Sequence, residues 1–196
     1  MKLARACAVT TLSAAVIAGG FATATAASAE PNTASAEAAP FTSKALDGGK
    51  VPSRQDATQL NQEQIDNART IIAVGKGADL STKAQKIAVM TALQESSLYN
   101  LDGGDRDSAG LFQQRPSTGW GTLEQVTDPV FASKSFYGVN PEGSNLGLIQ
   151  IEGWETMLPG AAAQSVQGSA YPDAYAKWDP LATELVNGNQ DVAPIS

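Results

Sequence analysis

Residues 87–93 read Ile-Ala-Val-Met-Thr-Ala-Leu, a run that would be apolar on almost every side of a helix. A helix of this kind is buried in the centre of a protein, because no polar face remains to meet water. Ser81 can cap its first turn, so the pattern predicts a central helix from Ser81 through Leu93 and beyond. We therefore expect a mainly α-helical domain that is built around this helix.

Further helices are expected before and after the central one, at residues 61–74, 129–137, 159–167 and 172–186. Gly75 and Gly77 should end the first of these helices, and Asp128 before Pro129 marks the start of the second. Glycine-rich segments between the helices should be irregular, at residues 100–121 and 138–153. A short hairpin is expected around residues 111–113.

The first 29 residues are expected to be a signal peptide. Lys2 and Arg5 precede an apolar run at 6–21, and residues 27–29 (Ala-Ser-Ala) form an A-x-A cleavage site. The alternative is a membrane anchor, but the run is shorter than the ~20 apolar residues of a spanning helix. We therefore expect a secreted protein with no membrane anchor in its mature form.

The rest of the chain divides into three parts by composition. Residues 30–57 are rich in Ala, Pro, Thr, Ser and Gly. They are expected to be a flexible linker, because they cannot bury enough apolar surface to fold. Residues 58–188 are the expected catalytic domain, whose length suits a single domain. Residues 189–196 are expected to be a disordered C-terminus.

Several classes of chemistry are excluded by residues that the chain lacks. It has no histidine, and its one cysteine, Cys7, lies in the expected signal peptide. A Ser-His-Asp or Cys-His mechanism and a zinc site of His and Cys ligands are therefore excluded, and we expect no metal or other cofactor. Without Lys2 and Arg5 the mature chain has 11 basic and 20 acidic residues, a net charge of −9, which does not suit nucleic acid. Catalysis would rest on carboxylates, Lys, Tyr, Ser or Thr, and in a secreted protein carboxylate chemistry indicates glycosidic bonds first.

Glu95 is the most informative carboxylate, because it falls in the last turn of the central helix. Partial burial and the negative end of the helix dipole should both raise its pKa, since both disfavour the ionised form. A raised pKa suits a general acid that protonates a leaving group. The alternative is a solvated glutamate on a fraying helix end.

Three short motifs follow one another along the chain: Glu-Ser at 95–96, Gly-Leu-Phe-Gln at 110–113 and Ala-Tyr at 170–171. With these motifs, the stretch 67–186 resembles the lytic transglycosylases and goose-type lysozymes of the lysozyme-like superfamily. It most resembles their small secreted domains from high-GC Gram-positive bacteria. The resemblance implies one lysozyme-like domain with a small irregular or β-hairpin lobe, and a substrate groove between this lobe and the helices.

The same resemblance implies roles for individual residues. Glu95 would be the catalytic acid, Gln113 would bind the sugar or its acetamide group, and Tyr171 would orient Glu95. Further residues are implied in substrate binding: Ser96, Gln114 and Phe112. For Phe112 the alternative is a place in the core, and for Gln114 it is a solvated surface position.

Asp102, Asp105 and Asp107 are candidates for a second carboxylate, which would position a water or stabilise the transition state. They could also begin a calcium loop, but Ala109 breaks the EF-hand spacing and no glutamate closes the loop. No metal is therefore expected. The third interpretation is that the aspartates cap their own backbone in turns.

The expected function is cleavage of the β-1,4 bond between N-acetylmuramic acid and N-acetylglucosamine in peptidoglycan. Lytic transglycosylation, in which the sugar's own 6-hydroxyl closes an anhydro ring, is preferred to hydrolysis by a muramidase, because the motifs resemble the transglycosylases more. The rivals are a lysozyme-like module that binds glycan without cutting it, and a structural protein with no sugar partner. The expected partner is the peptidoglycan glycan strand, and we expect a cell-wall-associated monomer.

Overall fold

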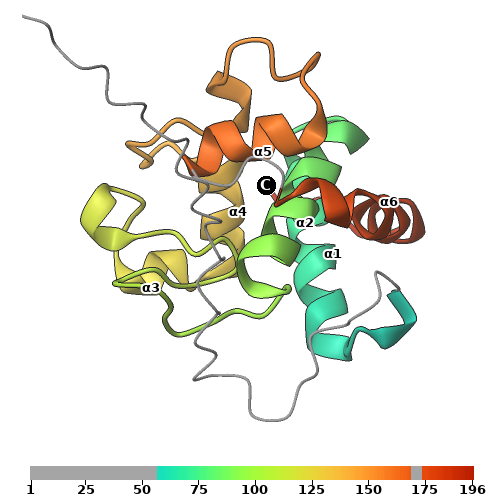
Figure 1. Ribbon diagram of the computed structural model, residues 1–196, viewed down its shortest axis with the longest axis horizontal. Coiled ribbons are helices and arrows are strands. Elements are labelled where there is room, and N and C mark those ends of the chain that lie inside the picture. Colours follow the sequence, from blue (N-terminus) through green and yellow to red (C-terminus); the bar gives the residue numbers. More distant parts are fainter. Residues whose placement is uncertain (1–56, 169–173) are drawn as a thin grey trace, which may run out of the picture. The chain divides into compact units, whose positions relative to one another are not determined.

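The computed structural model describes residues 57–168 and 174–196, so the expected signal peptide (1–29) and nearly all of the expected linker (30–57) lie outside the described residues. Within these ranges the fold is mainly helical, as predicted, with six α-helices and no β-strand (Figure 1). The helices are α1 (Gln62–Gly77), α2 (Thr82–Ser96), α3 (Leu123–Val126), α4 (Pro129–Tyr137), α5 (Pro159–Gln167) and α6 (Asp179–Gly188). None of these helices combines the length and the apolar character needed to cross a lipid bilayer.

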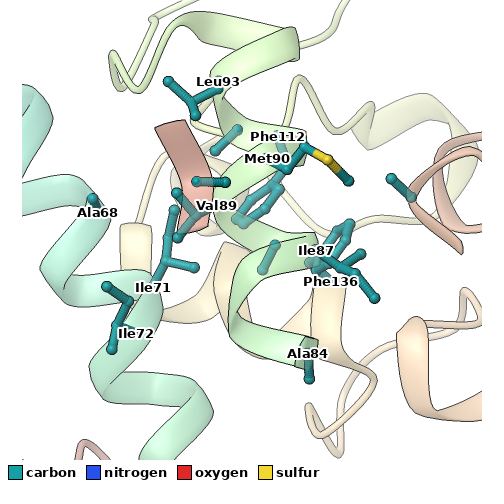
Figure 2. Close-up of a cluster of buried hydrophobic side chains, with 14 of the residues drawn as sticks. Ala68, Ile71, Ile72, Ala84, Ile87, Val89, Met90, Leu93, Phe112 and Phe136 are labelled. Atoms are coloured by element: carbon teal, nitrogen blue, oxygen red, sulfur yellow. The ribbon is translucent and has the colours of Figure 1, made fainter. Parts of the chain in front are cut away.

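The central helix is α2, which contacts α1, α4, α5 and α6. Ser81 caps it as expected, because the Ser81 side chain accepts a hydrogen bond from the backbone amide of Ala84. Residues 87–93 are all buried. Figure 2 shows Met90 of α2 among side chains from neighbouring elements, including Phe112. The apolar run therefore forms the core of the domain.

Helix α1 begins as predicted but ends later. Asn61 caps it through a reciprocal pair of hydrogen bonds with Gln64. The helix continues through Gly75 and ends at Gly77, so only the second of the two glycines marks its end. Gly75 is buried, and a Cβ atom at this position would lie 2.8 Å from Tyr137 Oη. Gly75 therefore allows a close approach between helices and is not a helix end.

Helices α4 and α5 have the predicted bounds, and Asp128 caps α4. The last helix, expected from residue 172, begins only at Asp179, after the short 3-10 helix η4 (Ala176–Trp178). Pro180 explains this start, because proline fits the first turn of a helix and not its interior. The sequence does not predict α3, whose 4 residues are too few to show a helical period.

A small lobe of residues 97–122 connects α2 to α3, and it is irregular apart from the 3-10 helix η2 (Pro116–Thr118). The predicted hairpin is reduced to one antiparallel bridge between Ala109 and Gln114, which closes the turn 110–113. Of the two lobe types that were expected, the described residues form the irregular one.

The C-terminal segment, residues 189–196, was expected to be disordered, and in the structure it makes specific contacts with α1. The backbone amide of Ile195 donates a hydrogen bond of 2.9 Å to the carbonyl of Ala73 in α1. Lys76 Nζ donates to two carbonyls of the segment, at 2.6 and 2.7 Å, and Val192 is buried. The segment is short of apolar residues, but groups at the end of α1 provide partners for its backbone.

Candidate active site

The candidate acid Glu95 lies in the last turn of α2, as the sequence predicts. The helix ends because Ser97 and Leu98 take left-handed backbone conformations, with φ of 54° and 64°. Their amides donate to the carbonyls of Leu93 and Ala92, both at 3.1 Å, and so close the last turn. Glu95 therefore lies on a capped helix end and not on a fraying one.

Glu95 is partly buried, and two side chains, those of Tyr175 and Gln167, act on its carboxylate. Tyr175 Oη donates to Glu95 Oε1 at 2.6 Å, and Tyr175 itself is buried. The second side chain is that of Gln167, the last residue of α5. Burial raises the pKa of Glu95, and the interactions with Tyr175 and Gln167 oppose this rise without cancelling it. Within the described part of the chain, no neighbouring charge is among the causes.

The residue before Glu95 is bound by the same segment of chain. Trp178 Nε1 donates a hydrogen bond of 2.9 Å to Gln94 Oε1. Tyr175 and Trp178 lie at the two ends of one 3-10 turn, in which the amide of Trp178 donates to the carbonyl of Tyr175 at 3.0 Å. Two successive residues of α2 are thus bound by two side chains from one short turn.

Two side-chain hydrogen bonds attach the lobe to the helices around Glu95. Ser96 Oγ donates to the carbonyl of Leu111 at 2.7 Å, and Gln167 Nε2 donates to the carbonyl of Phe112 at 2.8 Å. Ser96 is almost completely buried, so its side chain holds the lobe and does not face solvent. The turn 110–113 is therefore fixed relative to the candidate acid.

Phe112 and Gln114, which the resemblance assigns to substrate binding, lie in the core. Phe112 is completely buried, and its ring stacks on Phe136 with the ring centroids 4.8 Å apart. Gln114 is also buried, and its amide donates to the carbonyl of Ala132 at 3.2 Å. Because neither side chain reaches solvent, we leave both out of the proposed binding surface.

Gln113 is partly exposed, but its amide group is engaged within the lobe. Its Oε1 accepts a hydrogen bond from Ser108 Oγ at 2.9 Å, and its Nε2 donates to the carbonyl of Gly110 at 3.2 Å. Ser108 also lines a surface pocket of about 340 Å³, together with Asp102 and Asp107. A ligand in this pocket would contact the residue that holds Gln113.

The three aspartates of the lobe differ in their surroundings, and Asp102 and Asp105 are both exposed. Asp107 accepts hydrogen bonds from Arg115 Nε at 2.8 Å and from the backbone amide of Ser117 at 2.7 Å. Hydrogen bonds from Ser117, and then from Arg115, hold the pKa of Asp107 well below its usual range. Asp107 thus has a turn-capping role. Among the residues that the structure describes, no three His, Cys, Asp or Glu side chains are grouped to hold a metal ion.

The tyrosine that contacts Glu95 is Tyr175, whereas Tyr171, the expected orienting residue, lies outside the described residues. The sequence does contain a signal for Tyr175, because residues 174–175 repeat the Ala-Tyr pair of residues 170–171. The choice between the two pairs depends on the path of the chain after α5, which no local pattern specifies.

Comparison with known proteins assigns no family to the chain: no model of a known protein family matches it, and neither does any curated protein. Its function is therefore inferred from the geometry around Glu95. A partly buried carboxyl group with a raised pKa carries a proton at a pH where a surface glutamate has lost it. Such a group can act as a general acid and, once ionised, as a general base.

Proposed function

We propose that the chain is a secreted enzyme that cleaves the glycan backbone of peptidoglycan, with Glu95 as its general acid. The observation that supports this proposal is the hydrogen bond of 2.6 Å from Tyr175 to Glu95 at the end of α2. This bond orients one carboxyl oxygen, while burial raises the pKa of the group. An acid that protonates a glycosidic oxygen needs both features, because the proton must be present and must be directed at the leaving group.

The proposed domain is lysozyme-like. The resemblance of the motifs implies a buried helix that ends in Glu-Ser and a small irregular lobe, and the structure adds a hydrogen bond from Ser96 that ties the lobe to this helix end. The proposal includes a monomer that acts on glycan strands at the cell wall and uses no cofactor.

The proposed reaction is lytic transglycosylation between N-acetylmuramic acid and N-acetylglucosamine. Glu95 gives its proton to the bridging oxygen as the bond from this oxygen to C1 of N-acetylmuramic acid breaks. The ionised Glu95 then takes the proton of the 6-hydroxyl of the same sugar, whose oxygen bonds to C1 and closes the anhydro ring. Glu95 ends protonated, and no water is consumed.

Transglycosylation is preferred to hydrolysis because hydrolysis needs a second carboxylate at about 5–9.5 Å from the first. Within the described ranges, no neighbouring charge contributes to the raised pKa of Glu95. Asp107 is already engaged by Arg115. The engagement of Asp107 by Arg115, with the closer resemblance of the motifs to the transglycosylases, favours a mechanism in which Glu95 acts alone, first as acid and then as base.

The release of sugars from purified peptidoglycan tests the proposal. Glu95→Gln keeps the size of the side chain but cannot give up a proton, so we expect turnover to fall by about 10²–10⁴-fold. Glu184→Gln is the matched control, because Glu184 is exposed on α6. Turnover of the Glu95→Gln protein within a few-fold of wild type would remove Glu95 from the mechanism.

Sedimentation with insoluble peptidoglycan separates catalysis from binding. A wild-type protein that sediments with the wall but releases no sugar would be a glycan-binding module. A protein that neither binds nor cleaves would have a different partner. Where sugars are released, their mass distinguishes the anhydro product from the hydrolysed one, because the two differ by one water.

A further inference from the structure

Two neighbouring side chains at the end of α2 are each bound by a side chain from one short segment. Tyr175 Oη donates to Glu95 at 2.6 Å, and Trp178 Nε1 donates to Gln94 at 2.9 Å. The chemistry proposed for Glu95 uses the first contact and gives the second no role. Gln94 and Trp178 thus form a contact beside the acid that the reaction itself does not require.

The two contacts together fix how η4 is oriented on α2. Residues three apart in a 3-10 turn lie on the same side of it, so Tyr175 and Trp178 both face α2. Successive residues of an α-helix point about 100° apart, so Glu95 and Gln94 are two separate anchor points. Together the two hydrogen bonds restrict the rotation of η4 on α2.

Trp178 is itself firmly held. Its side chain is almost completely buried, and Lys177 Nζ lies 5.2 Å from the centroid of its ring. The next residue, Asp179, forms an ion pair of 2.9 Å with Lys86, further back along α2. Trp178 therefore belongs to a row of contacts along α2 that ends at Glu95.

We propose that Trp178 is a positioning residue, whose hydrogen bond to Gln94 holds the hydroxyl of Tyr175 against Glu95. Trp178 acts on Glu95 indirectly, through the position of Tyr175. The proposal rests on the proposed function, because Glu95 is the acid of that reaction. The hydrogen bonds themselves are properties of the free protein and can be measured without substrate.

The pKa of Glu95 is a suitable measure of this positioning. The titratable side chain that contacts Glu95 is that of Tyr175, and the charged group beside Trp178 is Lys177, which lies over the Trp178 ring. No charged group in the described ranges contributes to the raised pKa. Trp178→Phe changes no charge, so a rise in the pKa of Glu95 would report a weakened hydrogen bond, whereas added hydration of the carboxyl group would lower the pKa.

NMR titration of the full chain, labelled with ¹³C in the glutamate carboxyl groups, measures this pKa. Tyr175→Phe should raise the pKa of Glu95, because the carboxylate loses a donor. Trp178→Phe and Gln94→Met should raise it in the same direction, although neither removes a direct donor. In a protein that already carries Tyr175→Phe, the addition of Trp178→Phe should raise the pKa of Glu95 no further. The reason is that Trp178 acts on Glu95 through the Tyr175 hydroxyl, which this protein lacks.

The rate of peptidoglycan cleavage gives a second measure. In Trp178→Phe we expect kcat to fall roughly tenfold or more while KM stays within about twofold, because a misplaced acid slows the chemical step more than it weakens binding. A rise in KM with an unchanged kcat would assign Trp178 to substrate binding and would contradict the positioning role.

An unchanged pKa of Glu95 in a folded but less stable Trp178→Phe protein would overturn the proposal, because Trp178 would then be merely structural. If Trp178→Phe does not fold, Gln94→Met removes the same hydrogen bond from the other side. If the wild type does not cleave peptidoglycan, the proposed function fails. The titration still decides whether Trp178 positions the Glu95 carboxyl group.

Discussion

Tyr175 and Glu95 lie 80 residues apart in the sequence, yet the Tyr175 hydroxyl donates a hydrogen bond of 2.6 Å to the Glu95 carboxylate. The contact joins the end of α2 to the segment before α6. Because Glu95 is partly buried there, its charged form is disfavoured and its pKa is raised. The burial that suits Glu95 to carry a proton therefore makes its ionised form destabilising to the fold.

Glu95→Gln should raise the melting temperature at neutral pH, because Gln is never charged. The pKa of Glu95 is higher in the folded state than in the unfolded state. The protonated form of Glu95 therefore gives its full stabilisation at a pH below the pKa of the unfolded state. This stabilisation is lost as the pH rises through the pKa of the folded state. The gain from Glu95→Gln should thus be largest near pH 7 and vanish below about pH 4. Thermal unfolding of both proteins between about pH 4 and about pH 7 measures the difference in melting temperature. A Glu95→Gln gain that does not depend on pH would contradict the explanation.

Changing Asp102, Asp105 and Asp107 together to Asn should leave the reaction product unchanged. The triple variant should lose stability, because Asp107 gives up its hydrogen bonds with Arg115 and the Ser117 amide in their charged form. Mass spectrometry of the released disaccharide-peptides should still show the anhydro product. If every product instead carried an added water, and one of the Asn substitutions stopped turnover, the chain would be a muramidase.

Gly75→Ala should lower the free energy of unfolding by about 1–3 kcal/mol, as overpacking does. The added Cβ atom would lie 2.8 Å from Tyr137 Oη, which donates a hydrogen bond of 3.1 Å to the carbonyl of Ile71. Gly188→Ala is the matched control, because no atom lies within 4 Å of a Cβ atom there. It should be neutral or stabilise α6 by up to about 1 kcal/mol. Urea unfolding of both proteins checks this, and equal effects would mean that Gly75 is not closely packed.

Deletion of residues 190–196 should lower the melting temperature and speed hydrogen exchange in α1. The deletion removes the bond from the Ile195 amide to Ala73 and the carbonyls that Lys76 binds. Deletion of Ser196 alone is the control, because it leaves these contacts in place. A segment that can be removed with no change in either measurement would be disordered in solution, as its sequence predicts.

The helices were predictable where the local signals were complete. Ser81 and Asp128 cap α2 and α4 as their sequences indicate, and the apolar run 87–93 is buried throughout. Prediction failed where distant groups decide the structure. Gly75 lies within α1, where Tyr137 Oη approaches it closely, and the C-terminal segment contacts groups on α1. No local pattern contains these partners.

The candidate site was predictable in part. Helix burial and the Glu-Ser pair single out Glu95, and the structure places it on a capped helix end. The positions of Phe112 and Gln114 could not be read from a motif, because their burial depends on Phe136 and Ala132, about twenty residues away. The contact with Tyr175 spans 80 residues, so only the folded chain reveals it.

The left-handed residues Ser97 and Leu98, directly after the Glu-Ser pair, have a consequence for protein engineering. A non-glycine residue in this conformation is strained by roughly 1–2 kcal/mol. Leu98 is buried, but Ser97 is only partly buried, so Ser97→Gly is the simplest way to relieve strain here. Directed evolution for heat tolerance alone would reach this substitution early. Glycine would also loosen the backbone beside the acid, so selection for turnover would favour keeping serine. Selection for heat tolerance and selection for turnover would therefore favour different residues at position 97.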